Sequence, residues 1–90
     1  MVTFEQVRID HKRLWTVLVR ADFKMNRQLY RDLEQHLRNI NAVMYHNTDI
    51  IARLISGIDW KNNEQEVGKL REQNKILREL FESLEDKVAA

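Results

Sequence analysis

The chain has 90 residues, of which 43% are hydrophobic and 32% are charged, and its net charge is +1. Ninety residues make one domain near the lower size limit for independent folding, and we expect that single helical domain to span residues 1–90. The chain contains no cysteine, which excludes disulfides, thiolate nucleophiles and cysteine-based metal sites. No apolar run approaches a membrane span and the N-terminus lacks a secretory signal pattern, so we expect no membrane partner and an intracellular, cytoplasmic location.

The first predicted element is a helix over residues 3–24. Thr3 can cap this helix, and Gln6 stands at the spacing of a capping box. A stripe with steps of three and four residues follows, as on one face of a helix: Phe4, Val7, His11, Leu14, Leu18, Ala21 and Met25. The competing interpretation is a strand from Trp15 to Phe23, because apolar and β-branched residues alternate there.

Two longer helices are predicted in the rest of the chain. The second runs from 27 to 56, with Asn26 as its N-cap and Gly57 as a left-handed C-terminal stop. The alternative is one continuous helix from the first element through residue 44. The third helix covers 63–88, where Asn62 and Gln65 have the spacing of a capping pair.

Each of the two longer helices carries an apolar stripe that is interrupted by one asparagine. One stripe consists of Leu33, Leu37, Ile40, Met44, Asn47, Ile51, Leu54 and Ile58, and the other of Val67, Leu70, Asn74, Leu77, Phe81, Leu84 and Val88. If the chain folds back near residue 60, Asn47 meets Asn74. Two facing amides can share a hydrogen bond, whereas a lone buried amide costs about 1–3 kcal/mol. We therefore expect this pair to set the register of an antiparallel hairpin.

Folding the first helix back near residue 25 gives layers of apolar side chains across all three helices. The predicted fold is therefore all-α: an antiparallel, up-down-up three-helix bundle with a long coiled-coil α-hairpin formed by about 27–56 and 63–88. An alternative architecture treats 67–88 as a short parallel zipper, in which Asn74 pairs with its own copy in a dimer.

The hairpin is longer than the first helix, so its tip should protrude and leave apolar side chains uncovered. Further apolar residues lie off the predicted core seam, and together they predict a surface for another protein or for a homo-oligomer. The predicted partner-binding residues are Ile50, Ile55, Ile58 and Trp60 at the tip, followed by Trp15, Val43, Tyr45, Ile76 and Leu80. The alternative is that the third helix packs more broadly and buries Ile76 and Leu80.

Little in the sequence points to a reaction. His11, His36 and His46 are the only strong candidates for metal binding or proton transfer. His36 and His46 are ten residues apart and cannot share an ion on one helix, and His11 falls on the core stripe. A slender bundle also implies no concave pocket. We therefore predict no catalytic residue, metal, cofactor or small-molecule substrate, and thus no enzyme.

The first third of the chain is basic. These side chains could contact a phosphate backbone: Arg8, Lys12, Arg13, Arg20, Lys24, Arg27 and Arg31. The alternative is a solvated face that pairs with acidic residues of the third helix. The best functional hypothesis is a non-enzymatic protein-interaction module, such as an assembly subunit, an adaptor or a regulatory inhibitor. The alternative is a nucleic-acid-binding regulator that uses the basic helix and dimerises through the zipper.

Overall fold

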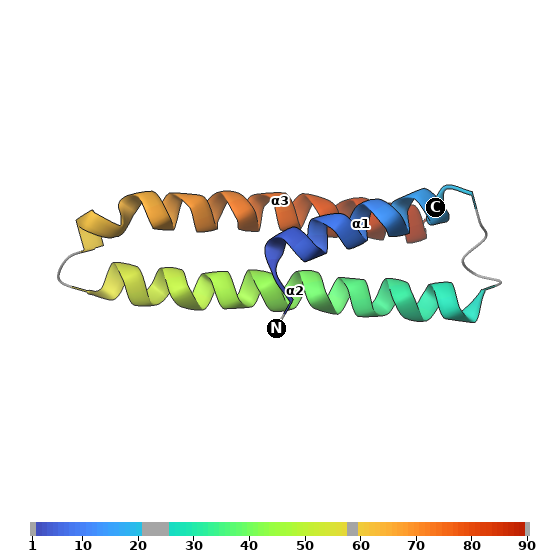
Figure 1. Cartoon of the computed structure of the whole chain (residues 1–90), viewed down its shortest axis with the longest axis horizontal. Coiled ribbons are helices and arrows are strands. Elements are labelled where there is room, and N and C mark those ends of the chain that lie inside the picture. Colours follow the sequence, from blue (N-terminus) through green and yellow to red (C-terminus); the bar gives the residue numbers. More distant parts are fainter. Residues whose placement is uncertain (1, 21–25, 58–59, 90) are drawn as a thin grey trace.

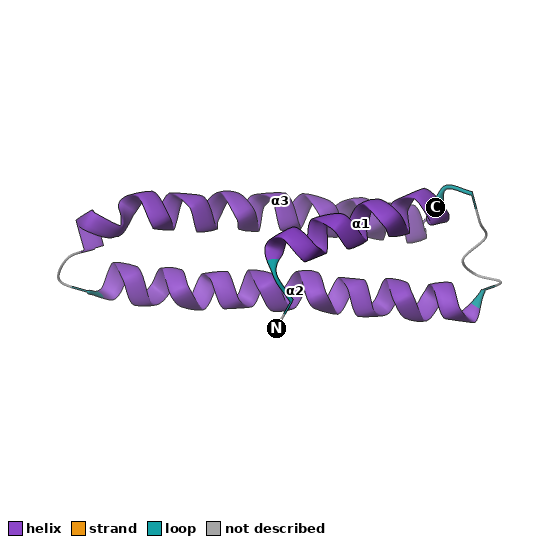
Figure 2. Cartoon of the chain, viewed as in Figure 1, coloured by secondary structure: helices purple, strands orange, loops and turns teal. Residues whose placement is uncertain are grey.

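A computed structural model describes residues 2–20, 26–57 and 60–89. It contains three α-helices, α1 (Phe4–Leu18), α2 (Arg27–Ser56) and α3 (Glu64–Ala89), and a short 3₁₀ helix, η2 (Trp60–Asn63), directly before α3. Figure 2 shows that helices make up nearly all of the described chain. The fold is therefore all-α, as predicted. None of these helices combines the length and the apolar content that a bilayer crossing requires.

The helices form an up-down-up bundle. Figure 1 shows α2 and α3 side by side along the whole length of the molecule and running in opposite directions, with α1 packed along one half of them. Two contacts agree with this direction: Asn47 bonds to Asn74, while Ile55, further along α2, lies beside Val67, earlier in α3. The molecule measures 53 Å along its long axis and 20 and 19 Å across it, as expected for a helix of 30 residues with two neighbours.

The start of α1 agrees with the prediction and its end does not. The backbone N–H of Gln6 donates to Oγ1 of Thr3 at 3.1 Å, so Thr3 is the N-cap. The helix ends at Leu18, and the next two residues form a turn, whereas the prediction extended the helix to 24. The β-branched residues near this end have restricted side-chain rotamers in a helix, which favours an early stop. The strand alternative is wrong as far as Leu18, and residues 21–25 lie outside the described part.

The ends of α2 and α3 show one confirmed cap and two corrections. Asn26 Oδ1 accepts a hydrogen bond from the N–H of Leu29 at 3.1 Å, so α2 begins at its own cap and the continuous-helix alternative is wrong. Gly57 ends α2 in an extended conformation, with φ −78° and ψ 160°, and not in the predicted left-handed one. Asn62 lies inside η2, because α3 continues from this 3₁₀ turn and begins at Glu64.

The core runs between all three helices. Its buried cluster consists of Val7, Leu18, Leu29, Leu33, Ile40, Val43, Leu77 and Leu84. On α2, burial includes Asn47 of the predicted stripe, but also Leu29, His36 and Val43, which lie beside that stripe. The reason is that α2 has two neighbours and therefore two adjacent seams: the predicted seam, and a second one that carries Leu29, His36 and Val43 at seven-residue intervals.

The predicted asparagine pair is present in the middle of the hairpin. Asn47, 4% exposed, donates from Nδ2 to Oδ1 of Asn74 and to Oε1 of Gln73, both at 3.1 Å. Asn74 in turn donates from Nδ2 to Oγ1 of Thr48 at 3.2 Å. These bonds satisfy amides that would otherwise lose their hydrogen bonds to water on burial. Because Asn74 pairs within the chain, the parallel zipper alternative does not describe this structure.

Candidate functional site

The tip of the α2–α3 hairpin extends beyond α1. Figure 1 shows α1 over the half of the hairpin farther from the α2–α3 turn, so α1 does not cover the tip. At the tip, Ile55 is 46% exposed and Ile50 is partly buried. Ile55 lines a depression of about 300 Å³ together with four residues of α3, which are Glu64, Val67, Gly68 and Arg71.

We call this hollow the tip depression. It is open at Gly68 of α3 because glycine has no side chain to fill it. A Cβ atom added to Gly68 would meet no atom of the described residues within 4 Å, so packing against them does not require glycine. A glycine inside a helix costs about 0.5–1 kcal/mol relative to alanine. Glu64 and Arg71 stand two turns apart on the same face, and the ion pairs among the described residues involve neither of them. The depression is therefore a small apolar surface between two unlike charges.

The other predicted contact residues have different surroundings. Val43 is 5% exposed and belongs to the core, so its prediction as a surface contact is wrong; it lies on the second seam of α2. Trp15 and Leu80 are partly buried against the core, and Ile76 is also partly buried, as the broader packing of α3 would produce. Tyr45 is 80% exposed on the outer face of α2. The remaining two predicted contacts, Ile58 and the side chain of Trp60, lie outside the described residues.

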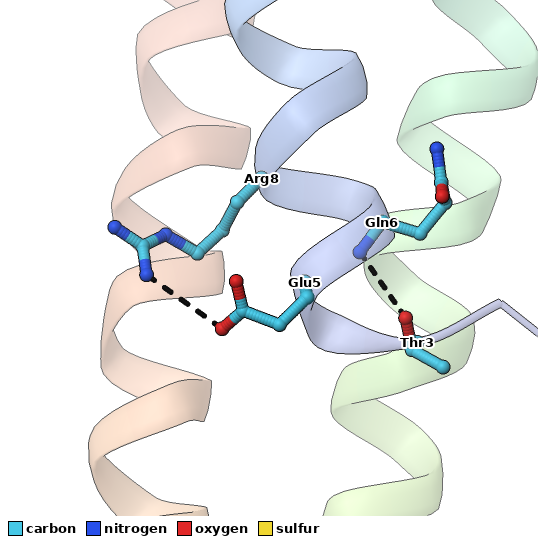
Figure 3. A network of polar contacts seen from close by, with 4 residues as sticks. All are labelled: Thr3, Glu5, Gln6 and Arg8. Carbon is cyan, nitrogen blue, oxygen red and sulfur yellow. Dashed lines mark hydrogen bonds and ion pairs between the residues drawn. The ribbon is translucent and has the colours of Figure 1, made fainter.

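The described members of the basic set have exposed side chains, and the structure gives specific surroundings for two of them. Arg8, with its guanidinium 3.7 Å from the carboxylate of Glu5, forms an ion pair within α1, next to the Thr3 cap (Figure 3). Arg13 instead lines a groove between α1 and α2. The other described members of this set are exposed, namely Lys12, Arg20, Arg27 and Arg31, while Lys24 lies outside the described residues. The described ion pairs all lie within single helices, so the pairing with α3 that the alternative interpretation expected is absent among them.

Two histidines from different helices meet at the α1–α2 contact. Nδ1 of His11 lies 3.1 Å from Nε2 of His36, and the ring of His11 stacks on Trp15 with centroids 6.0 Å apart. His36 is 4% exposed, and its Nδ1 is buried without a hydrogen-bond partner among the described residues. An unpaired hydrogen-bond acceptor is less costly to bury than an unpaired N–H. This favours the tautomer in which Nδ1 of His36 carries no proton and Nε2 of His36 donates to His11.

Burial keeps both imidazoles neutral. Burial, then the charge of His11, lowers the pKa of His36 to about 4, against a smaller opposite effect of Asp10. Burial also lowers the pKa of His11. Because burial disfavours the charged form of each ring, and a charge on His11 further disfavours one on His36, the pair resists protonation near neutral pH. Within residues 2–20, 26–57 and 60–89, no third histidine or carboxylate joins the pair in a group that could hold a metal ion.

The groove beside this pair has a volume of about 470 Å³. Its apolar part comes from Leu14, Val17 and Leu29, and its polar part includes Asp10, Arg13, Asp32 and His36. The described lining contains no serine, threonine or cysteine, which are the usual nucleophiles of covalent catalysis. Nε2 of His36 already faces His11, so this nitrogen is not free to take a proton from a bound molecule.

Sequence reasoning missed the histidine pair and the tip depression for different reasons. His36 lies seven residues after Leu29 and seven before Val43, and this spacing was the available signal for a second buried seam. The depression depends on how closely α2 and α3 approach near Gly68, and the spacing of residues along the sequence does not reveal this distance. Comparisons of the chain with family models, with characterised proteins and with solved structures find no match.

Proposed function

We propose that the chain is a non-enzymatic protein–protein interaction module that binds through the tip of its α2–α3 hairpin. An assembly subunit, an adaptor or a regulatory inhibitor would fit this role. We also propose an intracellular, cytoplasmic location, which agrees with a chain that lacks cysteine.

The observation that carries the proposal is the exposed Ile55 beside Gly68 at a tip that α1 does not cover. A large aliphatic side chain half in water gains free energy when a partner covers it, at about 25 cal/mol per Å² of apolar surface. The helix glycine costs stability and serves no contact with the described residues, so it is explained best by a surface that approaches from outside. No observation favours nucleic-acid binding by the basic side chains as the exposed Ile55 favours protein binding at the tip. We therefore propose a single function.

The test is capture of proteins by the immobilised chain from an extract of its native cell. Ile55→Asp places a charge in the tip depression without touching the core cluster, so helicity measured by circular dichroism should not change. Asn41→Asp, on the exposed outer face of α2, is the matched control. We expect the wild type and the control to retain the same protein and Ile55→Asp to lose it. Identical capture by all three chains would contradict the proposal.

A further inference from the structure

The charges around Gly68 have a symmetry of their own. Glu64 and Arg71 lie at equal distances along α3 from the midpoint between Val67 and Gly68. These four residues are spaced by three, one and three, so they share one face of the helix, and all four line the tip depression. The positions three and four residues from Glu64 and from Arg71 within α3 carry no opposite charge. Each charge is therefore left to interact with a group outside its own helix.

A two-fold axis through this midpoint would make the surface complementary to itself. In an antiparallel pair of α3 helices, Glu64 of one copy lies opposite Arg71 of the other, and the same contact occurs twice. The two Gly68 positions lie at the crossing, where the absence of a side chain lets the backbones come close. Ile55 of each copy lies at the side of the crossing and would be covered there.

We propose that the tip depression binds a second copy of this chain, in an antiparallel two-fold pair of α3 helices that cross at Gly68. This inference rests on the proposed function and names the partner for the same surface. One helix crossing buries less area than a standard protein interface, so the dimer is weak and concentration-dependent. Its two ion pairs are near solvent and are screened by salt, so high ionic strength should weaken the dimer further.

The first experiment is analytical ultracentrifugation of the full chain over a range of concentrations. Gly68→Leu fills the crossing point, and the open space around Gly68 means that this variant should still fold. Ala42→Leu adds the same side chain on the exposed outer face of α2 and serves as the control. We expect the wild type and Ala42→Leu to dimerise alike and Gly68→Leu to bind itself about tenfold more weakly or not at all. A wild type that is monomeric throughout, or a dimer unaffected by Gly68→Leu, would overturn the inference.

The second experiment exchanges the charges. Glu64→Arg places arginine opposite arginine in both contacts of a homodimer, and Arg71→Glu places glutamate opposite glutamate, so each variant alone should dimerise more weakly. An equimolar mixture of the two variants restores two unlike pairs and should form a heterodimer. A mixture that associates no better than the separate variants would contradict the two-fold arrangement. A merely structural role of these residues would not produce this recovery.

The two proposals can fail separately. If the wild type stays monomeric while Ile55→Asp still abolishes capture of a different protein, self-association is wrong and the tip remains the binding surface. If the chain neither dimerises nor loses capture with Ile55→Asp, both proposals are wrong.

Discussion

Asn47 donates a hydrogen bond from Nδ2 to Oδ1 of Asn74 at 3.1 Å, and this bond joins α2 to α3 in the middle of the hairpin. With Gln73 and Thr48, it forms a polar layer between apolar ones. A shift by one heptad would place each amide against an apolar side chain and leave it without its partner. The pair therefore selects one register for the two helices, and that register places Ile55 beside Gly68.

Removing one amide should cost more than removing both. Asn74→Leu leaves Asn47 buried with Gln73 as its remaining partner, and we expect a loss of about 1–3 kcal/mol in the free energy of unfolding. The double variant Asn47→Leu/Asn74→Leu removes the buried amide of Asn47 together with its partly buried partner and should recover this loss, because an apolar layer needs no hydrogen bonds. Urea unfolding measures both effects. A double variant that is less stable than the single one would show that the pair contributes net stability beyond register.

The hairpin could be predicted because its signals are local and redundant: two stripes, a short connection and one amide on each helix. The second seam of α2 was missed, since α2 lies between two helices and a single stripe was assigned to it. Val43 and His36 are buried for this reason. The exposure of Ile55 follows from its place off both seams. The arrangement of Glu64, Gly68 and Arg71 around Ile55 could not be predicted, because it depends on the space between packed helices.

Stability should fall in mildly acidic solution because of His36. Its pKa is about 4 in the folded chain, whereas the ordinary value of 6.5 applies when the chain is unfolded. Between these two values the unfolded chain binds a proton that the folded chain does not. The contribution of His36 to the free energy of unfolding is therefore fully present above about pH 6.5 and is lost progressively toward pH 4, by up to about 3 kcal/mol. The lowered pKa of His11 acts in the same direction.

Urea unfolding at several pH values between about 7.5 and 4.5 checks this prediction. His36→Leu should remain folded, since it replaces a buried polar group by an apolar one. Its free energy of unfolding should lose most of its dependence on pH in that range. His46→Leu, the control at an exposed position, should keep the pH dependence of the wild type. If His36→Leu and the wild type lose stability in parallel, another group is responsible.

Gly68→Ala should stabilise the monomer. The added methyl group meets no atom of the described residues within 4 Å, and alanine loses less backbone entropy than glycine when it enters a helix. We expect a gain of about 0.5–1 kcal/mol in the free energy of unfolding, measured at a concentration low enough for the chain to be monomeric. A loss of stability would show that the tip is packed more tightly than the structure shows.

Val43 and Tyr45 should respond oppositely to truncation. Val43→Ala removes methyl groups from the core and should cost about 1.5–3 kcal/mol. Tyr45→Ala removes a side chain that is 80% exposed and should change stability by less than about 0.5 kcal/mol. Thermal unfolding of the two variants provides the comparison. Equal effects would contradict the placement of Val43 on the second seam.

The antiparallel pairing of α2 with α3 is the claim on which the tip, its depression and the proposed contacts all depend. A nitroxide label on a cysteine introduced at Asp49 tests it directly, because the chain has no other cysteine. In a dilute, isotopically labelled monomer, we predict that the label broadens the amide signals around Glu72, which lies two residues before Asn74 just as Asp49 lies two after Asn47. A parallel pairing of the two helices would instead bring Asp49 close to the C-terminal part of α3. Broadening centred on Glu85, with the signals around Glu72 unaffected, would therefore contradict the account.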